Sequence, residues 1–134
     1  MIYAYSQNVT VNQNERVSFN NVALKKGCTC LLSSPKSLIL PRKGLYQVTV
    51  CANGSVPSAT TDASQTLSLQ ISDINSAKAS ITVTDTSTQN LCVSSVINVP
   101  TDAKCCNAPV EVYVTNTGAT ATYTDISIII TKIG

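Results

Sequence analysis

Apolar and polar residues alternate with a period of two along much of this chain, which is the pattern of half-buried β-strands. The clearest case is residues 110–115, where three valines fall on one face, and residues 67–72 repeat the pattern. Residues 46–51 and 91–97 also predict long strands. Further strands are expected at the N-terminus and at residues 17–24, 28–32, 38–40 and 80–84.

Residues 126–131 start by alternating and then become apolar on both faces, because Ile128, Ile129 and Ile130 follow one another. A sheet inside one sandwich is covered on a single face, so this pattern predicts a central strand whose second face is covered by a neighbouring subunit. We therefore expect these three isoleucines to contribute to a contact between subunits.

Turn-forming residues separate the predicted strands, and no change in composition marks a domain boundary. About ten strands with no credible helix predict an all-β fold, a two-sheet jelly-roll sandwich that forms a single domain over residues 1–134. The composition agrees with this class. The chain contains 17 Thr, 14 Val and 11 Ile, residue types that suit a pleated and half-buried surface.

The charge pattern argues against two classes of partner. Charged residues make up 12% of the chain, the net charge is +2 and like charges form no long run, so we expect no nucleic-acid partner. The longest apolar run, Ile128 to Ile130, is far too short to span a membrane, so no membrane partner is expected. The first seven residues lack the basic and apolar regions of a signal peptide, which predicts folding in the cytosol.

Candidate catalytic chemistry is scarce. Histidine is absent, which excludes Ser-His and Cys-His triads and every His-ligated metal centre. The acidic residues fall mostly in predicted turns, with no close pair suited to acid–base catalysis. The glycines are scattered singly and form no phosphate-binding loop. We therefore expect neither an enzyme nor a bound cofactor.

The six cysteines carry the unusual chemistry of the chain. Cys28, Cys30, Cys105 and Cys106 could supply four thiolates to zinc, but their spacing is not that of a zinc ribbon, so no metal site is expected. Small buried side chains and disulfides are the alternatives. In a jelly roll, Cys51 and Cys92 fall at one level of two antiparallel strands. Because synthesis in a reducing cytosol is expected, we predict two adjacent, buried and reduced thiols there.

Residues 37–50 (SLILPRKGLYQVTV) resemble the conserved block of the C1q and tumour-necrosis-factor superfamily. In that family a short strand and a Pro-containing turn precede a glycine, here Gly44, and an aromatic residue two positions later, here Tyr46, opens a central strand. Tyr46, Val48 and Val50 share one face, which is expected to point into the sandwich. Within the superfamily, the whole sequence is most similar to small stand-alone virion proteins of tailed phages and prophages of gut Gram-positive bacteria.

The resemblance implies a homotrimer, with Ile128, Ile129, Ile130 and Tyr123 as interface residues. It also implies a non-enzymatic virion protein, a capsid decoration or head fibre that contacts the major capsid protein or another virion protein. Such a protein would be made in the cytoplasm of the bacterial host and displayed on the virion surface. The alternative is an attachment module at a fibre tip that binds a host-surface glycan, which predicts a pocket of convergent polar groups with a stacking tyrosine.

Overall fold

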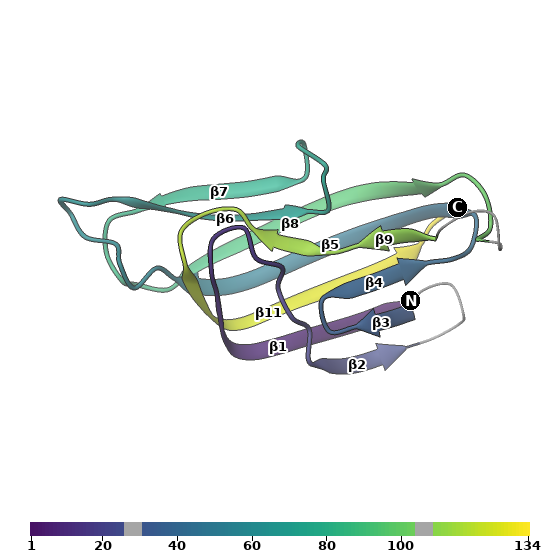
Figure 1. Cartoon of the computed structure of the whole chain (residues 1–134), viewed down its shortest axis with the longest axis horizontal. Helices are drawn as coiled ribbons and strands as arrows, with labels where there is room; N and C mark the ends of the chain where they lie inside the picture. Colours follow the sequence, from purple (N-terminus) through teal and green to yellow (C-terminus); the bar gives the residue numbers. More distant parts are fainter. Residues whose placement is uncertain (26–30, 104–108) are drawn as a thin grey trace.

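The structure is a computed structural model that describes residues 1–25, 31–103 and 109–134, and the side chains of residues 31–33 are not part of that description. The described residues form eleven strands and no helix, all paired antiparallel (Figure 1). One sheet has five strands in the order β2 (Asn21–Lys25), β1 (Ile2–Val11), β11 (Ala121–Lys132), β5 (Gly44–Ser55) and β8 (Gln89–Val99). It forms one layer of a sandwich.

The second layer contains two three-stranded sheets, with the orders β3-β4-β9 and β10-β6-β7. Their bounds are β3 (Leu31–Ser34), β4 (Ser37–Leu40), β9 (Val110–Val112), β10 (Val114–Asn116), β6 (Gln65–Ile71) and β7 (Lys78–Val83). β9 and β10 follow one another along the chain and are separated by Tyr113 alone. The two small sheets therefore form one continuous layer, and the predicted two-sheet jelly roll is confirmed.

Residues 14–17 extend this second layer beside β10. The Val17 amide donates to the Val114 carbonyl at 2.8 Å, and the Asn116 amide donates to the Glu15 carbonyl at 2.9 Å. This stretch is not part of the strand expected at residues 17–24, because Val17 and Phe19 are buried in a coil and β2 begins only at Asn21. The strand expected at residues 28–32 lies partly outside the described residues, and β3 begins at Leu31.

The core between the two layers consists mainly of Val, Ile and Leu side chains, together with Phe19, Tyr46 and Tyr123. Tyr46, Val48 and Val50 are fully buried on the inner face of β5. The Tyr46 hydroxyl donates to the Arg42 carbonyl at 2.8 Å, which ties the strand to the turn before it. Gly44, the first residue of β5, has φ +152°, and a Cβ there would lie 2.7 Å from the Gly134 carbonyl oxygen. Only glycine fits this position without strain.

The subunit contact expected on the central strand β11 is wrong for three of its four residues. Tyr123, Ile128 and Ile130 are fully buried inside the monomer, so none of the three can contact another subunit. They lie on the inner face of a strand that keeps its alternation, with one register shift between Tyr123 and Asp125. Ile129 points to the opposite face and is half-buried, beside Tyr3 on β1 and Thr49 on β5.

The Cys51–Cys92 pair also needs a correction. The two residues are direct register partners on β5 and β8, as predicted, with a Cα–Cα distance of 4.2 Å. They are joined by a disulfide and are not reduced. Nor are they buried, since Cys92 is exposed and Cys51 is half-buried. The physical reason is the period of two, because a strand that points Val50 and Ala52 inward must point Cys51 outward.

Candidate functional site

The outer faces of the two layers differ in chemistry, and this contrast is the main functional feature of the described residues. On the five-stranded sheet, the outward apolar residues are Tyr3 and Tyr5 on β1, Ile129 on β11, Leu45 on β5 and Val96 on β8. Uncharged polar residues lie between them on the same face, namely Gln47 and Thr49 on β5, Ser127 and Thr131 on β11, and Ser94 and Asn98 on β8. Strands β1, β11, β5 and β8 are described completely, and Asp125 is the one charged side chain that they present on this face. The face is therefore large and nearly uncharged.

Apolar residues concentrate at the end of this sheet where the two chain termini lie (Figure 1). The exposed fractions of Leu45, Val96 and Ile133 are 41%, 54% and 52%. Ile133 pairs with Leu45 through a 2.8 Å hydrogen bond from its amide to the Leu45 carbonyl. All the exposed large hydrophobic residues among the described ones, Met1 and Val22 included, lie in or directly beside strands of this sheet.

The opposite end of the same face is polar. Gln7, Asp125, Asn53 and Asn90 form one register row across β1, β11, β5 and β8. The Asn90 amide donates to Asn53 Oδ1 at 3.0 Å, and the Asn53 amide donates to Asp125 Oδ1 at 3.0 Å. These hydrogen bonds fix the direction of the Asn90 and Asn53 amides. The polar side chains at this end of the face are therefore held in one arrangement.

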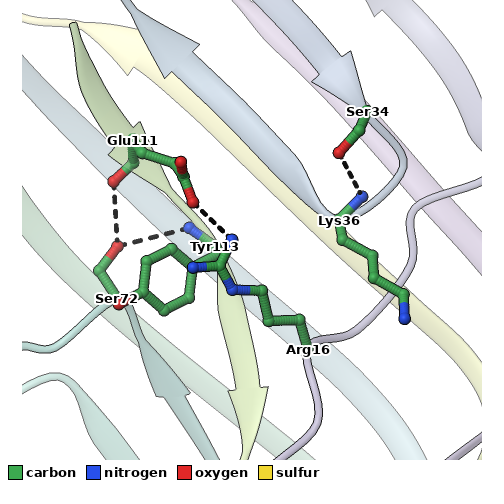
Figure 2. A network of polar contacts seen from close by, with 6 residues as sticks. All are labelled: Arg16, Ser34, Lys36, Ser72, Glu111 and Tyr113. Atoms are coloured by element: carbon green, nitrogen blue, oxygen red, sulfur yellow. Dashed lines mark hydrogen bonds and ion pairs between the residues drawn. The ribbon is translucent and has the colours of Figure 1, made fainter. Parts of the chain in front are cut away.

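The outer face of the second layer carries charges. Figure 2 shows the Arg16 guanidinium lying over the Tyr113 ring, with 3.7 Å between Cζ and the ring centroid. Arg16 also forms an ion pair with the Glu111 carboxylate. Burial raises the pKa of the Tyr113 hydroxyl, and a hydrogen bond with Asp73 raises it further. The Arg16 and Glu111 side chains are 40% and 43% exposed, so their charges are paired with each other and remain in contact with solvent.

Tyr113 is also the point where the strand predicted at residues 110–115 breaks. Ser72 has φ +49°, its amide donates to the Tyr113 carbonyl at 2.7 Å, and its hydroxyl lies between the Glu111 carbonyl and the Tyr113 amide (Figure 2). Ser72 therefore intrudes on the β-ladder of this strand. Because the two segments are 41 residues apart, no local pattern could have predicted the interruption.

Surface grooves among the described residues accompany these features. One lies on the five-stranded sheet and is lined by Tyr3, Tyr5, Gln7 and Asp125, with the two tyrosine rings edge to face at 6.2 Å. A second lies near Arg16 and Lys36, the latter on the β3–β4 turn (Figure 2). The third lies on the outer face of β6 and β7 and is lined by hydroxyl and amide groups. The sequence pattern predicted none of them by position.

A metal site at four cysteines and a membrane-spanning segment were both considered from the sequence. Cys28, Cys30, Cys105 and Cys106 lie outside the described residues. Within residues 1–25, 31–103 and 109–134, no group of three His, Cys, Asp or Glu side chains is arranged to hold a metal ion. In the same ranges, no helix has the length and hydrophobicity to cross a lipid bilayer.

Comparison with known proteins gave matches by structure alone. No protein-family model matches the sequence, and no curated protein matches it. The globular domain of zebrafish complement 1qA matches with a TM-score of 0.66 at 8% identity, over 99% of this chain and 96% of that chain. Eiger TNF from S. frugiperda matches with a TM-score of 0.66 at 11% identity, over 99% and 92%.

The vertex protein P5 of phage PRD1 matches with a TM-score of 0.56 at 17% identity, over 99% of this chain and 96% of that chain. At these identities the similarity establishes the fold. The chain therefore has the C1q/TNF-like jelly-roll fold that residues 37–50 predicted.

Proposed function

We propose that this protein is a non-enzymatic structural component of a bacteriophage virion. In this proposal it self-associates as a homotrimer through the outer face of the five-stranded sheet and displays the second layer outward. We call the first surface, centred on Tyr3, Leu45, Val96 and Ile129, the association face. We call the outer surface of the second layer, with Arg16, Lys78 and Glu111, the display face.

The observation that carries this proposal is the contrast between the two faces. Burying apolar area against a second subunit is favourable, about 25 cal/mol for each Å² removed from water, whereas burying unpaired charges is costly. The association face offers exposed Leu45, Val96 and Ile133 and a single carboxylate, Asp125. The display face carries an ion pair and an exposed lysine. Self-association should therefore use the first face and leave the second in water.

The assignment to a virion is supported by a structural similarity, because a vertex protein of a phage has the same fold over nearly its whole length. It also continues the expectation drawn from the sequence. Synthesis in the host cytoplasm and display on the particle surface, in contact with the major capsid protein or another virion protein, complete the proposal. Cryo-microscopy of particles that contain this protein should show threefold-symmetric density on the particle surface.

A matched pair of substitutions tests the association face. Ile129 and Ile39 are both half-buried isoleucines in mid-strand, on opposite outer faces of the sandwich. We expect Ile129→Asp to dissociate the trimer into folded monomers, because a buried unpaired carboxylate is costly. Ile39→Asp should leave the trimer intact. Sedimentation velocity gives the mass and circular dichroism checks the fold. If Ile39→Asp dissociates the trimer and Ile129→Asp does not, the two faces have been assigned the wrong way round.

A further inference from the structure

The groove on β6 and β7 opens on the display face and has a volume of about 300 Å³. Such a volume lies at the lower end of the range for small-molecule sites. The side chains that line it are the amides of Gln13 and Gln65, the hydroxyls of Thr66, Ser68, Ser80 and Thr117, the methyl group of Ala119 and the ammonium of Lys78. Self-association through the opposite layer leaves this groove open to solvent.

The floor of the groove is a chain of three hydroxyls from three segments. Ser68 is 1% exposed, and its Oγ receives a hydrogen bond from Ser80 Oγ at 2.7 Å. Thr117 Oγ1 lies 2.7 Å from the same Ser68 oxygen. Each hydroxyl has one donor and two acceptor positions, so the outer members, Ser80 and Thr117, keep capacity for a further partner in the groove.

The wall beside this floor is rigid. The Thr117 amide donates to the Ser68 carbonyl at 3.0 Å, and the Ala119 amide donates to the Thr66 carbonyl at 2.9 Å. Gly118 between them packs so closely on β6 that a Cβ would lie 2.9 Å from the Ser68 nitrogen and collide with the Thr66 carbonyl oxygen. The hydroxyls are therefore held in place before any ligand arrives, which reduces the entropy lost on binding.

The composition of the lining indicates the chemistry of a ligand. Hydroxyl and amide side chains pair with a ligand rich in hydroxyls, and an apolar ligand would leave them without hydrogen bonds, which is costly. Among the lining residues, Lys78 alone is charged, which favours a ligand with one anionic group. A saccharide that carries a carboxylate has both properties.

We propose that this groove binds an acidic saccharide, with its hydroxyls on Ser80 and Thr117 and its carboxylate towards Lys78. None of the described residues that line the groove is aromatic, so we expect a single sugar to bind weakly. Display of three grooves on one trimer would raise the avidity for a polymeric saccharide without any new contact. This last step alone rests on the proposed trimer, because the groove itself lies within one chain.

Nuclear magnetic resonance titration with glucuronate, and with glucose as its neutral counterpart, tests the proposal. We expect saturable shifts of the amides of Ser68, Ser80 and Thr117, larger for glucuronate. Lys78→Gln should remove most of the preference for glucuronate, a factor of about three, since an exposed ion pair contributes little. Ser80→Ala should weaken the binding of both sugars about fivefold, as expected for one lost hydrogen bond.

Two variants on strands of the five-stranded sheet, away from the groove, serve as controls. Ser94→Ala removes an exposed cross-strand hydroxyl that lies 3.2 Å from Thr49 Oγ1, and Lys132→Gln removes an exposed ammonium. Both should bind as the wild type does. Absence of saturable shifts, or a loss of the glucuronate preference that is equal in Lys78→Gln and Lys132→Gln, would overturn the proposed site. Sedimentation of the same samples reports the trimer separately, so failure of one proposal is distinguishable from failure of the other.

Discussion

At the scale of single residues, Asn116 does the most to connect the parts of the fold. It is fully buried, and its Nδ2 donates to the carbonyls of Val11 at 2.9 Å and Ala119 at 3.0 Å. Its Oδ1 accepts a 3.0 Å hydrogen bond from the Tyr123 hydroxyl. One amide therefore links the end of β1, the β10–β11 turn and the core tyrosine of β11.

Replacing Asn116 with Ala should destabilise the protein by about 2–4 kcal/mol, because it removes buried hydrogen bonds to the Val11 carbonyl and the Tyr123 hydroxyl and a part-buried one to the Ala119 carbonyl. Urea denaturation followed by circular dichroism gives the free energy of unfolding. Asn98→Ala, at an exposed position on β8, is the matched control and should change that free energy by less than about 0.5 kcal/mol. Equal effects of the two variants would show that the Asn116 network contributes nothing.

Tyr123 predicts how stability depends on alkaline pH. Burial raises the pKa of its hydroxyl above the usual value of 10.0. Above about pH 10 the unfolded chain therefore loses the proton while the folded chain retains it, so the free energy of unfolding falls as pH rises. Tyr123→Phe should reduce this fall between about pH 8 and about pH 10.5, measured by urea denaturation at both. An unchanged pH dependence in the variant would contradict the burial of an ionisable hydroxyl.

At the scale of elements, a disulfide reinforces the long antiparallel ladder between β5 and β8. The Cys51–Cys92 disulfide joins positions separated by 41 residues. Loop-closure entropy for that length gives about 4 kcal/mol of stabilisation. We expect the double variant Cys51→Ala/Cys92→Ala to lose a large part of this stabilisation, measured as the free energy of unfolding. Thr49→Ala/Ser94→Ala alters the neighbouring cross-strand pair and should cost less than about 1 kcal/mol.

Alkylation of the native protein followed by mass mapping checks the same bond chemically. The peptides that contain Cys51 and Cys92 should be found linked to each other and unlabelled until a reductant is added. Labelling of both thiols without a reductant would show that they are free. The double alanine variant would then be as stable as the wild type, and the entropic contribution of the disulfide would be absent.

The elements were also predictable to different degrees. Alternation placed β5, β6, β8 and β11 because their signal is local, and residues 37–50 identified the fold. The same alternation, applied consistently from Val50, assigns Cys51 to the outer face, so the error there came from expecting cysteine to be buried. The break of β9 and β10 at Tyr113 depends on contact with Ser72, which sequence periodicity does not report.

At the scale of the whole molecule, the proposed function assigns assembly to one face of the sandwich and display to the other. Sequence pattern alone predicted a contact between subunits from the consecutive isoleucines of β11. Alternation places Ile128 and Ile130 on the face of Ile126, which is the core face, and Ile129 on the outer face, so the error came from assigning all three isoleucines to one interface. The grooves were beyond the reach of the sequence pattern, since each is built from strands and turns that are distant in sequence. A face-specific assembly leaves the display face, and its hydroxyl-lined groove, accessible on every subunit.

The mass of the protein in solution tests this account most directly. Sedimentation velocity of the wild-type protein at micromolar concentration should show one species with three times the chain mass of 14.1 kDa. The apolar end of the association face should then be buried, so a hydrophobic dye should bind the Ile129→Asp monomer more strongly than the wild type. A stable 14.1 kDa species at that concentration would contradict self-association, and with it the assignment of the two faces.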